Sequence, residues 1–528
     1  MTGLQTDEPS VRNKGIDSAH WLRSPLIPWA GAIIVAAVAW AVRAVGITTD
    51  YNIFIDETTY TRIAYNLASG KGLTLYGVPF DLHPPAGFAI MAAAIKIFSM
   101  HGSLAEVLFD LRPFMALLGA LTCALVFILV GMVTNWPTGL VAAAVIAFDP
   151  FEIFYDSRVM LEGPAQLAAI GSVVLLAASV DRTRKRRSWL LTCGGGLTAG
   201  LALCVKEDFG LVLVIMLVLA TTLGWVLERS KAAVALVLTI GSYLVSQLLV
   251  VLTAGFGPWW RQVGSGLRRL IGVEQTTGFN SAAVHVSLTS RLAADATHFG
   301  VTYLILGFGA VTGVCQVVSA IRHRAEQRGI QQVARAEQLV ALWATSAVVY
   351  LVYATTLGTL EEQMYYLLLV PGLCTLVIWC HRNGPRLGPH WRKIFTAIIA
   401  GLLVADSAVW AAVHSTRDDE YRQLLAWAPK HLPDRSTIAV SESTAQFLMH
   451  GVVIGQWSTV PELVAHHVEY VLLSTTLVSQ GYGIGTPAFE QYLDSHAKIA
   501  WQATGPSSGD LILCLLYTSP SPRDRQKS

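Results

Sequence analysis

The feature that most constrains this chain is a repeated series of apolar runs, each close to the length that crosses a lipid bilayer. A spanning helix needs about 20 apolar residues, because the hydrocarbon core is about 30 Å thick. Only 14% of the 528 residues are charged, against about 25% in soluble domains. The chain is therefore predicted to be an all-α polytopic membrane protein with eleven spans, at residues 26–48, 111–133, 138–156, 162–180, 189–205, 209–227, 232–254, 299–321, 339–357, 364–380 and 394–413.

One further apolar segment decides the orientation. Residues 85–99 are few for a span and include Lys96, and a Lys at the bilayer centre costs about 2.5–3.5 kcal/mol. We therefore expect this segment to form a helix at the membrane surface. With the N-terminus in the cytoplasm, the basic loops then face the cytoplasm, as the positive-inside rule favours. These loops are residues 181–188, 228–231, 322–335 and 381–393.

This orientation divides the chain into four parts. Residues 1–25 form a cytoplasmic tail, and residues 26–413 form the transmembrane domain in the cell membrane, with an outer loop at 48–110. Residues 414–516 predict a small extracytoplasmic α/β domain, because an amphipathic helix is followed by strand-like runs. The expected strands are Thr437–Val440 and Glu469–Ser474. Residues 517–528 resemble a translated sequencing adapter, so we expect them not to be native and the native C-terminus to be missing.

Charge and motifs exclude several classes of function. The formal net charge of +2 argues against a nucleic-acid partner. No zinc-like cysteine spacing, Walker A loop or Rossmann fingerprint occurs, so no cofactor is certain. The acidic run Asp418-Asp419-Glu420 could bind a divalent cation, although a solvated helix start is the commoner explanation.

The adjacent acids Asp56 and Glu57 are the first candidates for chemistry. They follow the first span by a few residues, where burial and mutual repulsion can raise one pKa toward the working range of a general base. The alternative is structural: Asp56 is the N-cap, and Glu57 the first-turn acid, of a helix that runs to Leu67. Both interpretations can hold together.

The acidic pair belongs to a longer pattern. A Gly-rich turn, Gly70-Lys71-Gly72, and His83-Pro84-Pro85 follow it in the same loop. Later motifs are Arg112 at the start of the second span, Arg158 and Glu162 four residues apart, Lys206 after an apolar run, and Tyr365-Tyr366 with Pro371. This order resembles the protein O-mannosyltransferase and aminoarabinose-transferase branch of the GT-C glycosyltransferases, over about residues 26–380.

The resemblance implies a fold, a donor and a set of roles. The GT-C fold is expected, with a polyprenyl-phosphate monosaccharide as donor and inversion at the anomeric carbon. Asp56 would be the general base and Glu57 its support. The donor phosphate would be held first by Arg112 and Lys206 and next by Arg158, although Arg112 and Lys206 could instead be snorkelling at the interface. Further substrate contacts are expected from His83, Glu162 and Tyr365.

Two positions depart from the aminoarabinose transferases. Those enzymes carry Arg where Thr59 stands and Lys where His83 stands, and both cations are expected at the donor phosphate. His83 matches the mannosyltransferase-like pattern better. Trp259-Trp260-Arg261 with Arg268-Arg269 predicts an amphipathic segment at the interface, which could also clamp donor or acceptor.

The sequence thus predicts a membrane glycosyltransferase that moves a monosaccharide from its lipid phosphate to an extracytoplasmic hydroxyl. The acceptor, whether protein, lipid or glycan, is left open. The rival is a transporter or flippase of a lipid-linked envelope precursor. A transporter should show inverted repeats and charged or broken helices near the bilayer midplane, whereas here the charges gather at the outer ends of the spans.

Overall fold

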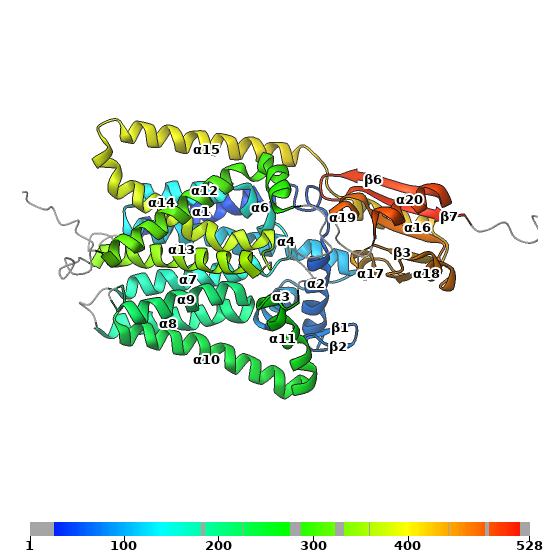
Figure 1. Cartoon of the computed structure of the whole chain (residues 1–528), viewed down its shortest axis with the longest axis horizontal. Coiled ribbons are helices and arrows are strands. Elements are labelled where there is room, and N and C mark those ends of the chain that lie inside the picture. The colour runs from blue at the N-terminus through cyan, green and yellow to red at the C-terminus, as the bar shows by residue number, and fades with distance from the viewer. Residues whose placement is uncertain are drawn as a thin grey trace, which may run out of the picture.

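The computed structural model describes residues 26–180, 185–224, 226–274, 287–322, 332–357, 359–441, 443–480 and 485–517. Long helices form a bundle, and a smaller domain with a mixed sheet lies at one end of it (Figure 1). The bundle helices are α1 (Leu26–Ala44), α4 (Leu104–Val133), α5 (Trp136–Phe148), α6 (Pro150–Asp156), α7 (Glu162–Ser179), α8 (Lys185–Val205), α9 (Glu207–Leu223), α10 (Arg229–Ala254), α12 (Leu288–Arg322), α13 (Gln332–Leu357), α14 (Tyr366–Asn383, preceded by the 3-10 turn Glu362–Tyr365) and α15 (Trp391–His414).

The chain is a multi-pass membrane protein, and the predicted fold class is confirmed. Within the described residues, eight helices are long and apolar enough to cross a membrane, or nine if the bent pair α5–α6 counts as one span. Each predicted run overlaps a helix, but the run 138–156 covers both α5 and α6, and the runs 26–48 and 209–227 extend past the ends of α1 and α9. In addition, α9 has 17 residues and α1 ranks as a shorter apolar helix over Pro28–Ala44. The total of eleven spans therefore stays a prediction.

The bend between α5 and α6 has a local cause. The two helices meet at 63°, where Asp149 has extended backbone angles ahead of Pro150. A residue before proline avoids the helical region, so the first helix ends there. The Asp149 carboxylate then caps the second helix by accepting the N–H groups of Phe151 and Glu152, both at 3.0 Å.

Short elements lie between the bundle and the C-terminal domain (Figure 1). They are α2 (Ile55–Ala68), β1 (Thr74–Leu75), β2 (Val78–Pro79), α3 (Ala86–Ile97) and α11 (Phe256–Leu270). The 12-residue α3 is a short apolar helix, in agreement with the expectation that residues 85–99 do not span. The side chain of Gln262 fixes the amphipathic α11 to the loop between β2 and α3. Its amide oxygen accepts the Asp81 N–H and its amide nitrogen donates to the Pro79 carbonyl, both at 2.8 Å.

The C-terminal domain contains a five-stranded sheet in the order β4-β3-β5-β7-β6. Its parallel strands are β3, β4 and β5, while β7 pairs antiparallel with β5 and β6. The elements are α16 (Glu420–His431), β3 (Thr437–Val440), α17 (Thr444–Leu448), β4 (Val453–Gly455), α18 (Val460–Ala465), β5 (Tyr470–Ser474), α19 (Thr475–Gln480), α20 (Pro487–His496), β6 (Ala497–Gly505) and β7 (Gly509–Leu516).

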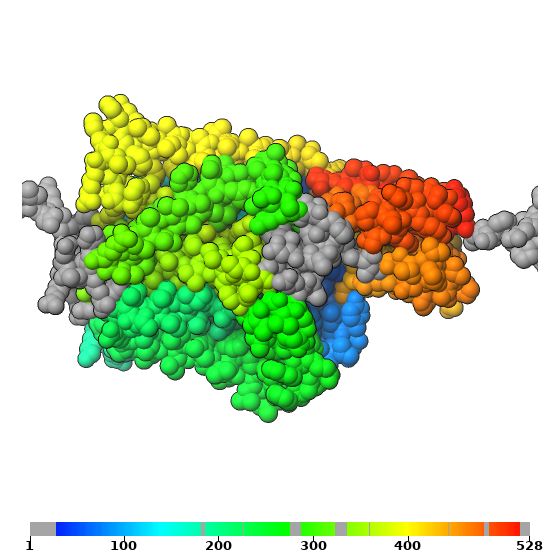
Figure 2. Space-filling model, in the orientation of Figure 1, coloured from blue at the N-terminus to red at the C-terminus, as the bar shows by residue number. Residues whose placement is uncertain are grey.

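This sheet separates two apolar layers. Successive strand residues point to opposite faces, so Ile438 and Val440 join the large core that continues into the bundle. Ala439 instead packs with Phe489 of α20 in a separate small cluster. In Figure 2 the orange and red surface of this domain meets the blue surface of the β1–β2 hairpin, with the green α11 beside it.

Asn52 fastens the C-terminal domain to the segment that enters α2. Its backbone N–H donates to the Asp418 carboxylate at 3.1 Å, and its side-chain amide donates to the Ser508 hydroxyl at 2.6 Å. Its amide oxygen accepts the Tyr421 N–H at 3.2 Å. The residues directly before the acidic pair are therefore held by the last part of the chain.

Candidate active site

The first turn of α2 gives the two adjacent acids different surroundings. The helix is capped by Phe54, and its first residue is Ile55. Glu57 accepts the Phe54 N–H at 3.1 Å, which is the hydrogen bond of a capping acid. Asp56 is therefore not the N-cap, and the structural alternative considered for it is wrong in that detail. Asp56 directly precedes Glu57 in the helix, so its side chain points to a different side.

Arg112 of α4 is fully buried, and all five of its N–H groups are used. Its Nε donates to Glu57 at 3.0 Å and its Nη2 at 2.8 Å, a bidentate ion pair. The remaining donors bind three backbone carbonyls of the loop, those of Ile47 and Tyr51 at 2.8 Å and that of Asn52 at 3.2 Å. No donor is left for a substrate phosphate in this arrangement, so the geometry does not favour that predicted role.

Glu57 is saturated in the same way. Besides Arg112 and Phe54, it accepts the Val159 N–H at 2.9 Å. Burial alone would raise the pKa of Glu57, but the Arg112 charge and hydrogen bonds, with the nearby Arg158 charge, hold the pKa below its usual value. An ionised acid whose lone pairs are all occupied is a poor proton acceptor. Glu57 and Arg112 instead lock α2, α4 and the loop together.

Asp56 has the opposite character. Its carboxylate is half-buried and has no hydrogen-bond partner among the residues that the structure describes. Burial raises the pKa of Asp56 to about 7, while Lys206 lowers it and Glu162 raises it further. A carboxylate with a pKa near the working pH and with free lone pairs can accept a proton from a substrate.

The surroundings of Asp56 come from four separate elements. Lys206, between α8 and α9, forms a buried ion pair with Glu162 at the start of α7. Arg269 at the end of α11 lies 3.3 Å from Glu361 in the segment before α14. Both pairs act electrostatically on Asp56. We call the group formed by Asp56 and these two ion pairs the acidic chamber.

His83 lies beside this chamber as a neutral ring. Its Nε2 is 3.3 Å from the Tyr60 hydroxyl of α2, and its Nδ1 is 4.0 Å from Glu207 of α9. Burial lowers the pKa of His83 to about 3, helped by the Lys206 and Arg269 charges. His83 can therefore donate or accept a hydrogen bond near neutral pH, but it does not supply a positive charge.

Arg158 is a buried cation whose guanidinium is not fully hydrogen-bonded within the described residues. It follows α6 and is 6% exposed, and its Nε and Nη2 have no hydrogen-bond partner among the described residues. The guanidinium stacks over the Phe154 ring, 3.9 Å from its centroid. Arginine stays protonated in proteins, so this is a buried charge with free donors. By its unpaired nitrogens, Arg158 is a stronger candidate for a phosphate contact than the paired Lys206 or the saturated Arg112, and the phosphate ligands stay a prediction.

The remaining candidates fall in different places. Tyr365 is half-buried and makes an edge contact with Tyr303, with ring centroids 6.1 Å apart. Its neighbour Tyr366 is buried in the bundle and donates to Asp156, which pairs with Arg43 at 2.8 Å. Glu207 and Glu361 could not be predicted as part of the site from the sequence, because an acid next to an apolar run is also common where a helix simply begins.

The possible cation site at residues 418–420 finds no support. No group of three His, Cys, Asp or Glu side chains within the described parts of the chain is placed to hold a metal ion. The Asp418 carboxylate is occupied instead by the N–H groups of Asn52 and Ser507, at 3.1 and 2.9 Å. Glu420 is fully buried at the start of α16, where burial raises its pKa to about 7.

Comparison with known proteins identifies the fold. No protein-family model and no curated protein matches the sequence. ArnT from Cupriavidus metallidurans, bound to undecaprenyl phosphate, matches with a TM-score of 0.56 and 12% identity over 94% of this chain and 100% of that one. The apo oligosaccharyltransferase of Archaeoglobus fulgidus matches with a TM-score of 0.59 and 13% identity over 96% of this chain and 76% of that one. The chain has the fold of the GT-C glycosyltransferases.

Proposed function

We propose that this protein is a membrane glycosyltransferase. It takes a monosaccharide from a polyprenyl-phosphate donor and transfers it, with inversion, to an acceptor hydroxyl outside the cytoplasm. The observation that carries the proposal is the contrast within one turn of helix. Glu57 is saturated by hydrogen bonds that include two from Arg112, while Asp56 has no hydrogen-bond partner in the described parts of the chain and a pKa of about 7. Such a residue is suited to general-base catalysis.

The reaction is a single displacement. Asp56 accepts the proton of the acceptor hydroxyl as its oxygen attacks the anomeric carbon, and the bond from that carbon to the phosphate oxygen breaks. The electron pair leaves with the polyprenyl phosphate, so negative charge grows on the phosphate in the transition state. Attack from the side opposite the leaving group inverts the anomeric centre.

Positioned cations stabilise that developing charge. Within the described residues, two nitrogens of the buried Arg158 have no partner. Lys206, paired with Glu162, acts electrostatically on Asp56. A lipid-phosphate donor agrees with the fold, because the ArnT structure of the same fold is bound to undecaprenyl phosphate. His83 contributes a neutral ring that can form hydrogen bonds with the substrate. Tyr365, in the 3-10 turn before α14, contributes a further substrate contact.

The orientation is part of the proposal. The basic loops predict a cytoplasmic N-terminus, and α2 and the C-terminal domain then lie on the outer side. A reporter that is active only in the cytoplasm should work when fused after Lys185 or Arg386, and it should fail after Gly72 or Ser441. A cytoplasmic signal at Ser441 would contradict the outer location of the site.

The direct test is transfer by the purified protein. Membrane extract and a panel of radiolabelled polyprenyl-phosphate sugars are incubated with the wild-type protein and with Asp56→Asn, and the label is followed. We expect covalent incorporation from at least one donor by the wild-type protein only. Label that crosses a proteoliposome membrane while still attached to its lipid, without incorporation, would instead indicate a transporter.

A further inference from the structure

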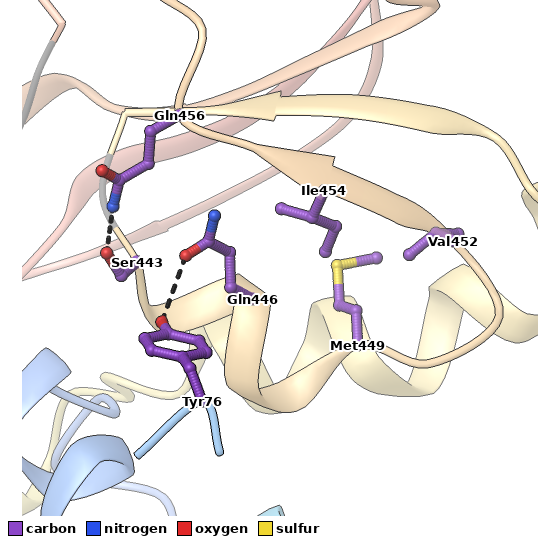
Figure 3. A pocket seen from close by; sticks show the side chains of 7 residues that line it. All are labelled: Tyr76, Ser443, Gln446, Met449, Val452, Ile454 and Gln456. Atoms are coloured by element: carbon purple, nitrogen blue, oxygen red, sulfur yellow. Dashed lines mark hydrogen bonds between the residues drawn. The ribbon is translucent and has the colours of Figure 1, made fainter. Parts of the chain in front are cut away.

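Two adjoining cavities lie between the outer loop and the C-terminal domain, away from the acidic chamber. The first has a volume of about 580 Å³ and is lined by Tyr76, Ser443, Gln446 and Gln456, with Met449 and Ile454 on its apolar side (Figure 3). The second, of about 530 Å³, is lined by Arg62, Asn66, Lys71 and Thr74. Both cavities include Tyr76 and Gln446, so they form one continuous groove, which we call the interdomain groove.

An exposed aromatic ring marks the middle of the groove. Tyr76 is 66% exposed, and its ring stacks on Phe447 with centroids 5.2 Å apart and an angle of 27°. Its hydroxyl donates to Gln446 at 3.4 Å (Figure 3). A Tyr at this hairpin tip is unusual, because Tyr76 and Gly77 have φ of 51° and 79°, and such two-residue turns prefer Asn and Gly. The turn holds a large ring where a small residue would fit more easily.

The polar wall of the groove is rich in amides and cations. Gln446, Gln456 and Asn66 present planar groups that both donate and accept hydrogen bonds. Arg62 of α2 is half-buried and Lys71 is exposed, and neither makes an ion pair within the described residues. The lining of both cavities contains no carboxylate. The ligand that such a wall fits is anionic and carries many hydroxyl or carbonyl groups.

The groove and Asp56 share α2, which fixes their separation. A helix rises 1.5 Å per residue, so Arg62 lies about 9 Å and Asn66 about 15 Å along the axis from Asp56. A single sugar does not cover that length, whereas an oligosaccharide does. A molecule lying in the groove must therefore cover at least this length to present a hydroxyl to Asp56.

We propose that the interdomain groove binds the acceptor, and that the acceptor is an anionic oligosaccharide or polysaccharide segment. This inference rests on the proposed transferase function, and it names the acceptor class. Tyr76 stacks against a sugar ring, the amides pair with its hydroxyls, and Arg62 and Lys71 pair with its carboxylates or phosphates. The acceptor hydroxyl is then presented to Asp56.

Binding is measured on the full-length protein in nanodiscs without donor, by saturation-transfer NMR and titration. The probes are a hexuronic-acid tetrasaccharide, its carboxyl-reduced neutral counterpart, and a tetraglutamate peptide. The variants are Arg62→Gln, Lys71→Gln and Tyr76→Ala. The matched control is Lys498→Gln, which removes an exposed lysine on β6, far from the groove lining.

We expect the acidic tetrasaccharide to bind more tightly than the neutral one and the peptide. Each cation variant should weaken its binding about threefold to tenfold at low salt, with less effect at high salt. Tyr76→Ala should weaken binding of both saccharides about tenfold, and Lys498→Gln should bind as the wild type does. Thermal unfolding midpoints verify that each variant is folded.

Three outcomes would overturn the inference: equal binding of the two saccharides, preference for the peptide, or groove variants that bind as well as the control. The measurement needs no turnover, so it is independent of the catalytic proposal. Saccharide binding that persists while no donor supports transfer would refute the transferase and leave the groove assigned. Transfer without saccharide binding would refute the groove alone.

Discussion

Two polar regions lie on either side of the first turn of α2, and they differ in how fully their hydrogen bonds are satisfied. Arg112 and Glu57 form a closed network in which every donor and acceptor has a partner. Among the residues that the structure describes, the Asp56 carboxylate has no hydrogen-bond partner. The same holds for two nitrogens of Arg158, whose charge acts on Glu57.

Whether a buried charged group is fully hydrogen-bonded indicates whether it stabilises the fold or is available to a ligand. A buried charge that is fully paired stabilises one arrangement of the backbone and has little left to offer a ligand. A buried charge with free donors is costly in the empty protein, and that cost is recovered when a substrate of opposite charge binds. Saturation thus separates two adjacent acids that the sequence presents as a pair.

Asp56→Asn should have the largest effect. We expect turnover to fall about 100-fold to 10,000-fold, the range of positioned general-base catalysis, with donor affinity and thermal stability close to wild type. Steady-state kinetics and thermal unfolding measure the two effects. Asp110→Asn, at an exposed position of α4, is the control and should behave as wild type. Near-normal transfer by Asp56→Asn would show that Asp56 is not the general base.

Arg112→Ala should act on stability instead. Removal of one partner leaves Glu57 buried and unpaired, which costs about 3–5 kcal/mol. Arg112→Lys should recover only part of it, since one ammonium cannot replace a five-donor fork. Thermal unfolding in detergent ranks the variants, and the donor KM of the protein that remains folded should be unchanged. A raised donor KM of the Arg112 variants with an unchanged unfolding temperature would indicate that Arg112 binds the phosphate. Arg112 would then not belong to a purely structural network.

Arg158→Gln should change the donor KM more than the stability, the opposite of what is expected for Arg112→Ala. Loss of a charge-assisted hydrogen bond of about 1.5–3 kcal/mol raises the donor KM about 10-fold to 100-fold. Stability should change little, because the substitution removes two buried donors without partners in the described residues but also the favourable charge interaction of Arg158 with Glu57. Kinetics at varied lipid-phosphate sugar, alongside unfolding of the same preparation, tests both parts. A clear loss of stability without a change in KM would place Arg158 with the closed network.

The pH dependence of the wild-type protein tests the same contrast without a substitution. Because burial raises the pKa of Asp56 to about 7, its basic form is depleted below that pH. We expect kcat/KM to rise about tenfold per pH unit up to about 7 and then to level off. The pKa of His83 is about 3, so no second step should appear near 6.5. A flat profile between pH 5 and 8 would argue against Asp56 as the titrating base.

Sequence periodicity was enough to predict the helices and part of the sheet. The strand Thr437–Val440 has the expected bounds, and the second expected strand begins one residue later, at Tyr470. The role of Arg112 could not be read in this way, because three of its acceptors are backbone carbonyls, which every residue possesses. The Arg269–Glu361 pair is equally hidden, since its members are 92 residues apart and meet only in the folded chain.

The bond between Asn52 and Asp418 has a consequence for biogenesis. The two residues are 366 positions apart in sequence. Translation proceeds at about 5–20 residues per second, so the loop waits roughly 20–70 s for its partner to be made. During that interval the segment entering α2 lacks this last anchor, although Arg112 can already bind Glu57 and the loop carbonyls. Truncated chains and slowly translated ones should therefore expose this loop to proteases.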